Sequence, residues 1–467
     1  MAAASFITMT RQDVEAGNWL DPLKSAWANG KTGLIKVAPE PSGDPELKQA
    51  IETMLSSNGS YRSGETVVIH ARPAALAMAC ETAYLLQEID ISAQVVLGIS
   101  SLAREVRELL EEVYGLGFDP LKIDPEALAG IGACYRELMA PIEADGGGHW
   151  IVPLGSSPDP DPTDIPAVDL FTKVASAGLA PIGMMRNDGR IVSHDIWLTP
   201  TGLDVERLNA DLAPDQHWTL DEWRSQVFRS MAVSADELKR LALGIEGVGL
   251  TIEASLKGGT LRYSREDGTD FTYRVDGRPV ILDCGRVGDN SLGGTEAFSS
   301  VITNQPTTEV FVAPIEDSAS GVIVFTVPER AVHGIIQAPY RIEMKAGRVV
   351  GASAPDKESE RILRHYTGLE QYDGLVSTGD EKSAFDLRRV IAEMAIAGFN
   401  PVQLPEIKNG RLRPVTGQVL IDEKLGDHQA FGSNDQFKGI NPSSIGDHHV
   451  EHTDFVGSVE RKVELLG

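Results

Sequence analysis

The sequence predicts an α/β N-terminal domain with a parallel sheet over residues 1–245, followed by an α+β domain over residues 246–467. Two observations favour this fold class. A strand–helix–strand pattern occupies residues 65–100, and after residue 245 short alternating runs separated by Asp-Gly pairs replace it. The length of 467 residues supports a division, because a single hydrophobic core stops growing at about 250–300 residues.

The first segment begins with the β-branched run Val67–Ile69, continues through an Ala- and Leu-rich stretch, and ends in a second such run at Val95–Leu97. Two strands joined by a helix lie parallel with a right-handed crossover, which predicts a βαβ unit. A charged amphipathic helix is expected at 101–114. A Pro/Asp-rich loop is expected at 156–166.

The second half of the chain favours antiparallel pairing. Alternating runs stand at 250–254, 260–264 and 270–275, and Asp-Gly pairs at 267–268 and 276–277 are typical hairpin turns. One more helix is expected at 383–395, before a turn that contains Gly, Asn and Pro.

The charge balance excludes several classes of partner. Forty-two basic residues against 68 acidic residues give a net charge of −26. Nucleic acid and anionic membrane surfaces both require clustered Lys and Arg, so neither is expected as a partner.

Cys80, Cys134 and Cys284 lie far apart and form no disulfide framework. The N-terminus lacks a signal-peptide pattern, and no apolar run approaches the roughly 20 residues of a membrane span. We therefore expect a cytoplasmic protein.

Histidines gather near the C-terminus. Four of the ten, His428, His448, His449 and His452, lie within 25 residues. Imidazole and carboxylate groups are the usual ligands of zinc, iron and manganese. On a strand, His452 and Asp454 share one face while Phe455 packs the other way. The pattern indicates a metal site, and a solvated surface cluster is the alternative that the local sequence leaves open.

Two further carboxylates stand out. Pro306 sets a turn and Glu309, three residues later, opens an apolar strand, and Glu393 lies near the end of the helix expected at 383–395. An exposed strand-edge acid and an ordinary helical acid are the respective alternatives. The sequence contains no HExxH, GxSxG or P-loop motif, and no dinucleotide-type glycine motif after a strand.

Five segments in this order resemble the aminopeptidase T-like thermophilic metalloprotease family, which includes two-metal leucyl aminopeptidases. They are Gly268–Thr272, Asn304–Phe311, Glu393–Pro401, Thr416–Gly432 and Gly432–Val456, and the resemblance covers about residues 250–460. The resemblance implies a metal-dependent aminopeptidase or related amide hydrolase that acts on an N-terminal peptide bond. It also implies a peptide or small amide substrate and a homodimer.

The resemblance further implies the site residues. Two divalent ions (Zn, Co or Mn) would share a nucleophilic water, as in other two-metal hydrolases. Glu309 and Glu393 would be both catalytic carboxylates and metal ligands. The complete set of implied ligands is Glu309, Glu393, His428, His452 and Asp454.

The sequence also departs from the family. Asp435 stands where some family aminopeptidases carry a tyrosine seven residues after the first histidine ligand, and Lys438 replaces a usual glycine. Residues 446–451 are extra, and the chain is longer before residue 245. Two alternatives therefore stay open. One is a mononuclear Fe(II) ring-cleaving dioxygenase, like the dihydroxypyridine dioxygenase of the same family. The other is a catalytically silent binding or scaffold protein.

Overall fold

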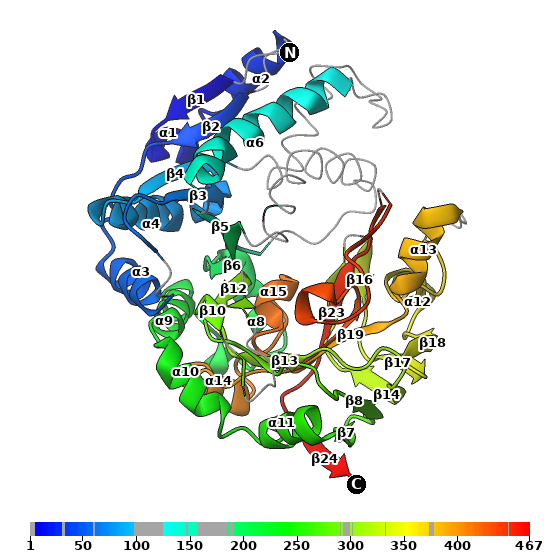
Figure 1. Cartoon of the computed structure of the whole chain (residues 1–467). Coiled ribbons are helices and arrows are strands. Elements are labelled where there is room, and N and C mark those ends of the chain that lie inside the picture. Colours follow the sequence, from blue (N-terminus) through cyan, green and yellow to red (C-terminus); the bar gives the residue numbers. More distant parts are fainter. Residues whose placement is uncertain are drawn as a thin grey trace. The chain divides into compact units, whose positions relative to one another are not determined.

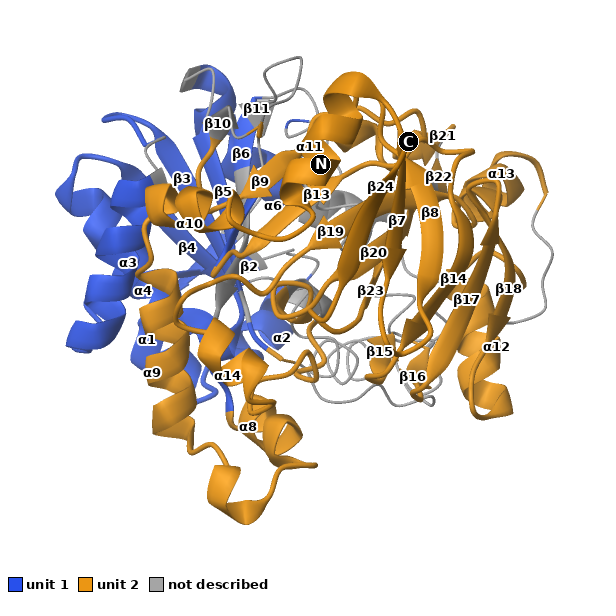
Figure 2. Cartoon of the chain, turned by 90° about the horizontal axis from the view of Figure 1, so that it is seen from below, with its two compact units in different colours: residues 1–155, 161–201, 301–305 blue, residues 156–160, 202–300, 306–467 orange. Residues whose placement is uncertain are grey.

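The computed structural model divides into two compact units. Unit 1 contains residues 1–155, 161–201 and 301–305, and unit 2 contains 156–160, 202–300 and 306–467 (Figure 2). The domain boundary expected near residue 245 is not tested by these units and stays a prediction. The structure describes residues 5–29, 33–58, 61–97, 125–145, 148–156, 185, 190–289, 291–292, 299–300, 302–331, 333–372, 378–446 and 448–467.

Unit 1 alternates strands and helices (Figure 1). Its described elements are β1 (Ser5–Met9), α1 (Arg11–Glu15), α2 (Leu20–Ala28), β2 (Gly33–Val37), α3 (Pro45–Asn58), β3 (Thr66–Ala71), α4 (Leu76–Glu88), β4 (Ser92–Leu97), α6 (Pro125–Asp145), β5 (Gly148–Leu154), β6 (Ile191–Leu198) and β12 (Ile302–Gln305).

These strands form one sheet in the order β1-β2-β4-β3-β5-β6-β12, in which every pairing except β2–β4 is parallel. The βαβ unit expected at 65–100 is confirmed as β3, α4 and β4, with Thr66 opposite Ser92. All six residues of β3 are buried, because a central parallel strand is covered on both faces. The helix expected at 101–114 and most of the loop expected at 156–166 lie outside the described residues.

Unit 2 carries helices first and then mostly strands. Its helices are α8 (Gly202–Asn209), α9 (Leu220–Met231), α10 (Ala235–Ala242), α11 (Val248–Lys257), α12 (Lys357–Tyr366), α13 (Gly379–Leu387), α14 (Leu404–Lys408) and α15 (Val419–Asp422). Its strands are β7 (Thr260–Ser264), β8 (Asp270–Arg274), β9 (Ile281–Asp283), β10 (Gly288–Asp289), β11 (Ser299–Ser300), β13 (Glu309–Val312), β14 (Ser320–Phe325), β15 (Glu329–Ala331), β16 (Gly334–Ile336), β17 (Tyr340–Lys345), β18 (Arg348–Ser353), β19 (Ile391–Ile396), β20 (His428–Gly432), β21 (Ser444–Ile445), β22 (His448–His449), β23 (His452–Val456) and β24 (Lys462–Leu466).

Two antiparallel sheets dominate unit 2 (Figure 2). One has the order β23-β20-β19-β13-β9 and the other the order β18-β17-β14-β8-β7-β24. A shared hydrophobic core contains Met394 and Phe455 from the first sheet and Tyr263 and Ile342 from the second. The α/β class is confirmed in its coarse form: a parallel-strand sheet in the N-terminal part, and further sheets in the C-terminal part.

Two expectations about unit 2 are corrected. The hairpin of β7 and β8 forms as expected, but residues 250–254 belong to helix α11, whose start is fixed by Gly247 in the left-handed region at φ 92°. The helix expected at 383–395 ends at Leu387, and Glu393 lies instead on β19. All six residues of β19 are buried in the middle of a sheet, and this burial overrides the helix propensity of Ala, Glu and Met.

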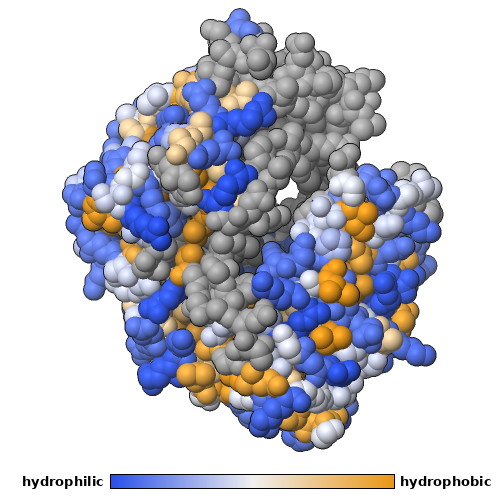
Figure 3. All heavy atoms as spheres, viewed as in Figure 1, coloured by the Kyte–Doolittle hydropathy of each residue, from blue (hydrophilic) through white to orange (hydrophobic). Residues whose placement is uncertain are grey.

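In the described part of the chain, no helix has both the length and the apolar run that a bilayer crossing requires. On the face drawn in Figure 3, the described residues are mostly hydrophilic, and apolar residues stand in small groups.

Candidate metal centre

The candidate ligands come from four neighbouring strands of the five-stranded sheet (Figure 2). Glu393 on β19 lies opposite Ala430 on β20, and Ala430 lies opposite Asp454 on β23, so a small side chain separates two carboxylates. His428 lies opposite Ala395, two residues from Glu393, and therefore on the same face. The opposite face carries Phe455 into the hydrophobic core, as expected.

Glu393 faces both histidines. His428 Nε2 lies 3.2 Å from Glu393 Oε1 and 3.3 Å from Glu309 Oε2. His452 Nε2 lies 3.4 Å from Glu393 Oε2 and 3.6 Å from Asp454 Oδ1. Four of the five side chains are buried, and that of His452 is 19 % exposed. The buried ones are Glu309, Glu393, His428 and Asp454. The structure thus brings all five sequence-predicted site residues into one cluster.

The opposite edge of each imidazole faces a backbone carbonyl oxygen. His428 Nδ1 lies 3.1 Å from the carbonyl oxygen of Glu423, and His452 Nδ1 lies 2.7 Å from that of Ser433. Carbonyl oxygens only accept, so each Nδ1 carries a hydrogen. In a neutral imidazole, Nε2 then presents a lone pair to carboxylate oxygens that also only accept. The lone pairs of Nε2 and of the carboxylate oxygens repel one another unless a cation lies between them. A metal ion fits this set of nitrogen and oxygen donors.

The electrostatics of these side chains lead to the same point. Burial raises the pKa of Glu309 to about 7, against the lowering effect of Lys424. Burial acts to raise the pKa of Glu393 as well, but hydrogen bonds with His428 and His452 outweigh it and lower this pKa to about 2. Burial acts to lower the pKa of His428, but its bond to Glu393 and the charge of Glu309 raise it to about 10. The surrounding carboxylates therefore favour positive charge at this site, whether it is a proton on His428 or a metal cation.

A buried oxygen of the cluster lacks a hydrogen bond. Glu309 Oε2 accepts none from the described residues, because His428 Nε2, 3.3 Å away, is hydrogen-bonded to Glu393 Oε1. A buried carboxylate oxygen without a donor is costly unless a cation satisfies it. Three groups have ligand atoms within 4.8 Å of one another and could each hold an ion: Glu309, Glu393 and His428; Glu393, His452 and Asp454; and Glu423, His428 and Asp454.

Sequence reasoning missed Glu423 and Lys424. Lys424 Nζ lies 2.6 Å from Glu423 Oε1 and 3.6 Å from Asp283 Oδ2, and it also donates to Glu309 Oε1. Both residues belong to a segment that carried the family resemblance. Nothing in the local sequence distinguishes Glu423 from an exposed acid, because its neighbours in the site lie far away along the chain.

The other residues singled out from the sequence lie elsewhere. His448 is exposed on β22, and the His449 side chain lies outside the described part. Asp435 is exposed, and its carboxylate accepts hydrogen bonds from the backbone N–H and the hydroxyl of Ser443. Lys438 adopts a left-handed backbone with φ 64°, a conformation that a glycine adopts more easily.

Comparisons with known proteins agree with the motifs. Residues 255–369 match the model of the thermophilic metalloprotease (M29) family, a segment that contains Glu309. The structure is similar to that of wild-type AmpT from Thermus thermophilus, with a TM-score of 0.57 and 17 % sequence identity over 90 % of this chain and 95 % of that chain. No curated protein matches the chain. The resemblance to the thermophilic metalloprotease family, drawn from the sequence motifs, is therefore confirmed.

Proposed function

We propose that the chain is a metal-dependent aminopeptidase, which holds two divalent ions and cleaves the N-terminal peptide bond of a peptide or small amide. One observation carries the proposal: the Nε2 atoms of His428 and His452 face opposite oxygens of the same buried carboxylate, Glu393. A carboxylate shared by two ligand groups is suited to holding two ions close together, as in two-metal hydrolases. The family match and the fold of AmpT support the same activity.

The two groups that share Glu393 define the ligands. Glu309 and His428 complete the first group, and His452 and Asp454 complete the second. Glu423 lies within reach of His428 and Asp454 and adds a further carboxylate. When bound, a pair of divalent ions polarises the scissile carbonyl and lowers the pKa of a water molecule.

The chain's own residues prepare this site. The Nδ1 hydrogens of His428 and His452 are donated to backbone carbonyl oxygens, which keeps each Nε2 free as a ligand atom. Lys424 donates to Oε1 of Glu309, which leaves Oε2 directed at His428. The net charge of −26 favours the approach of a cationic amino terminus and disfavours anionic substrates.

A mononuclear iron site needs a single facial group of three ligands. Two groups around one shared glutamate support a pair of ions instead. Asp435, in the place of the family tyrosine, is exposed and is not one of the candidate ligands, so this departure leaves the ligand set intact. Hydrolysis therefore decides whether the protein is catalytically silent. Both alternatives are separated from the proposal by the experiment below.

The test measures metal content and hydrolysis together. The purified chain is loaded with Zn²⁺, Co²⁺ or Mn²⁺, its ions are counted by plasma mass spectrometry, and release of the first residue is followed on a free peptide and its N-acetylated form. We expect two ions per chain and cleavage of the free peptide alone. Glu393→Gln should lose at least one ion and about 10³-fold in activity. Glu343→Gln, the same change at an exposed strand position, should lose neither.

Three results would contradict the proposal. A chain that binds no divalent ion has no metal centre. A single iron with oxygen consumption on a hydroxylated heteroaromatic compound would identify the dioxygenase. Two bound ions without hydrolysis of any free peptide would identify a silent member of the fold.

A further inference from the structure

The loop of residues 433–441 touches the candidate metal centre at two points. The carbonyl oxygen of Ser433 accepts the hydrogen of His452 Nδ1 at 2.7 Å. The ring of Phe437 packs edge-on against His452, with 5.6 Å between ring centroids, and against Phe311, with 4.9 Å. The orientation of His452 therefore depends on where this loop is held.

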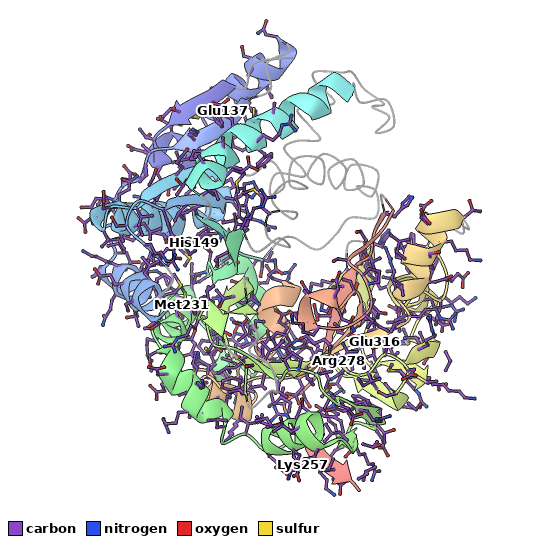
Figure 4. The ribbon with its side chains drawn as sticks, in the orientation of Figure 1. Glu137, His149, Met231, Lys257, Arg278 and Glu316 are labelled. Atoms are coloured by element: carbon purple, nitrogen blue, oxygen red, sulfur yellow. The ribbon has the colours of Figure 1, made fainter. Side chains whose placement is uncertain are left out.

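A buried ion pair outside the loop holds it in place. Glu316 Oε1 accepts hydrogen bonds from Asn434 Nδ2 at 2.9 Å and from the backbone N–H of Ile440 at 2.8 Å. Glu316 Oε2 accepts from Arg278 Nη2 at 2.6 Å, and Arg278 Nη1 donates to the carbonyl oxygen of Lys438. Figure 4 labels Arg278 and Glu316, which lie beside each other. The two side chains are 9 % and 11 % exposed, so water competes little with these bonds.

The loop is also closed on itself. The side chain of Asn434 is fully buried, and its Oδ1 accepts the backbone N–H of Asn441 at 2.9 Å. Asn441 Nδ2 donates to the carbonyl oxygen of Gly432 at 3.0 Å, next to Ser433. A Cβ at Gly439 would lie 1.9 Å from Asn434 Oδ1, so the close approach requires glycine there. A displacement at Asn434 is therefore passed directly to the Ser433 carbonyl.

The other histidine has its own support. His428 Nδ1 faces the carbonyl oxygens of Glu423 and Gly426, and neither residue belongs to the 433–441 loop. A change in the loop should therefore disturb His452 and leave His428 in place. This asymmetry makes the role of the ion pair measurable.

We propose that Glu316 and Arg278 are positioning residues, which hold the 433–441 loop so that Ser433 fixes the tautomer and orientation of His452. They thereby set the affinity for the ion held by Glu393, His452 and Asp454. The inference rests on the proposed function, because it assumes that the site holds two ions. Neither residue contacts a candidate ligand among the described contacts, so the effect is transmitted through the loop.

The test titrates the metal-free chain with Co²⁺ alone, by calorimetry and by the visible spectrum of the bound ion. Both carboxylate oxygens of Glu316 accept hydrogen bonds. Glu316→Gln keeps the shape of the side chain but replaces one of these acceptors by an amide N–H₂ group, which faces the same donors and cannot accept from them. We expect the Kd of one Co²⁺ step to rise at least tenfold and that of the other to stay within twofold. Arg278→Lys, which keeps the charge but loses the planar pair of donors, should give a smaller rise in the same step.

The matched control is Asp270→Asn, which breaks an exposed carboxylate–arginine pair with Arg262 at 2.7 Å and should change neither step. Equal weakening of both steps in Glu316→Gln, or no change in either, would overturn the inference. If that variant does not fold, Arg278→Lys decides it by the same criterion. A native chain that binds fewer than two ions refutes the proposed function instead, and this result is visible before any variant is made.

Discussion

Replacing Lys424 by methionine tests whether the acidic cluster is held together by a buried cation. The Nζ atom, in a side chain 2 % exposed, contacts carboxylates of Glu309, Glu423 and Asp283. Three donors of one ammonium thus face three carboxylates. Methionine keeps most of the volume of the side chain and removes the charge, so packing changes little and the electrostatic contribution is isolated.

The magnitude follows from the burial of the partners. Removing one member of a buried ion pair costs about 3–5 kcal/mol, because the remaining charge has no compensation. The side chains of Glu309 and Glu423 are each 6 % exposed. Burial raises the pKa of Glu309 to about 7, and the charge of Lys424 acts to lower it, so the variant raises this pKa further. A carboxyl group with a raised pKa in the folded state contributes stability at low pH that is lost as the pH rises. The destabilisation should therefore be larger at pH 8 than at pH 6.

The assay is urea unfolding of the chelator-treated chain at both pH values, followed by circular dichroism. Lys257→Met is the matched control. Its side chain, labelled in Figure 4, is 73 % exposed and pairs with Glu253 one helical turn away, so its loss should cost no more than about 0.5 kcal/mol. A loss below about 1 kcal/mol for Lys424→Met at pH 8, or a loss that shrinks as the pH rises, would refute the reasoning.

Two further predictions concern a buried histidine of unit 1 and a glycine opposite His452. Burial lowers the pKa of His70 from 6.5 to about 4, so between these pH values the unfolded chain binds a proton that the folded chain does not. This difference contributes up to ~3 kcal/mol to the free energy of unfolding. The contribution is complete above pH 6.5 and is lost as the pH falls to 4. His70→Asn should flatten this dependence in hydrogen exchange of the β3 amides, and an unchanged slope would contradict it. Gly432→Ala should cost more than ~2 kcal/mol in urea unfolding, because φ is 113° and a Cβ would lie 1.8 Å from the carbonyl oxygen of Glu451, beside His452. Gly249→Ala in an exposed helical turn, with nothing within 4 Å, should instead stabilise by about 0.5–1 kcal/mol, and equal effects of the two changes would argue against the backbone explanation.

Local signals were sufficient for some elements of the site. The alternation around His452, Asp454 and Phe455 predicts a strand with one polar and one buried face, and the structure has β23 there. Glu309 was expected to open an apolar strand after Pro306, and it opens β13. In both cases the pattern lies within six residues, which is the range over which a strand's faces are defined.

Other elements depend on contacts that no short window contains. The segment 383–395 spans the end of α13 and the start of β19, so a single helix over it is wrong. Glu423 and Lys424 become functional candidates through Glu309, more than a hundred residues earlier. The same holds for Glu316, whose partner Asn434 is 118 residues away. Pairings of this kind follow from sheet order, which periodicity does not specify.

Acidic residues have different energetic consequences on the surface of the chain and inside the buried site. Most acidic residues of a chain with net charge −26 are explained by solvation. The cluster contains five buried carboxylates and one ammonium, that of Lys424, which contacts three of them. Four negative charges remain when all five carboxylates are ionised. The five carboxylates are those of Asp283, Glu309, Glu393, Glu423 and Asp454. Two divalent ions carry the same charge with opposite sign. Burial raises the pKa of Glu309 and of Glu423, so protons or cations must balance such a surplus in a buried site. The charge count therefore supports the proposal that the site holds divalent cations.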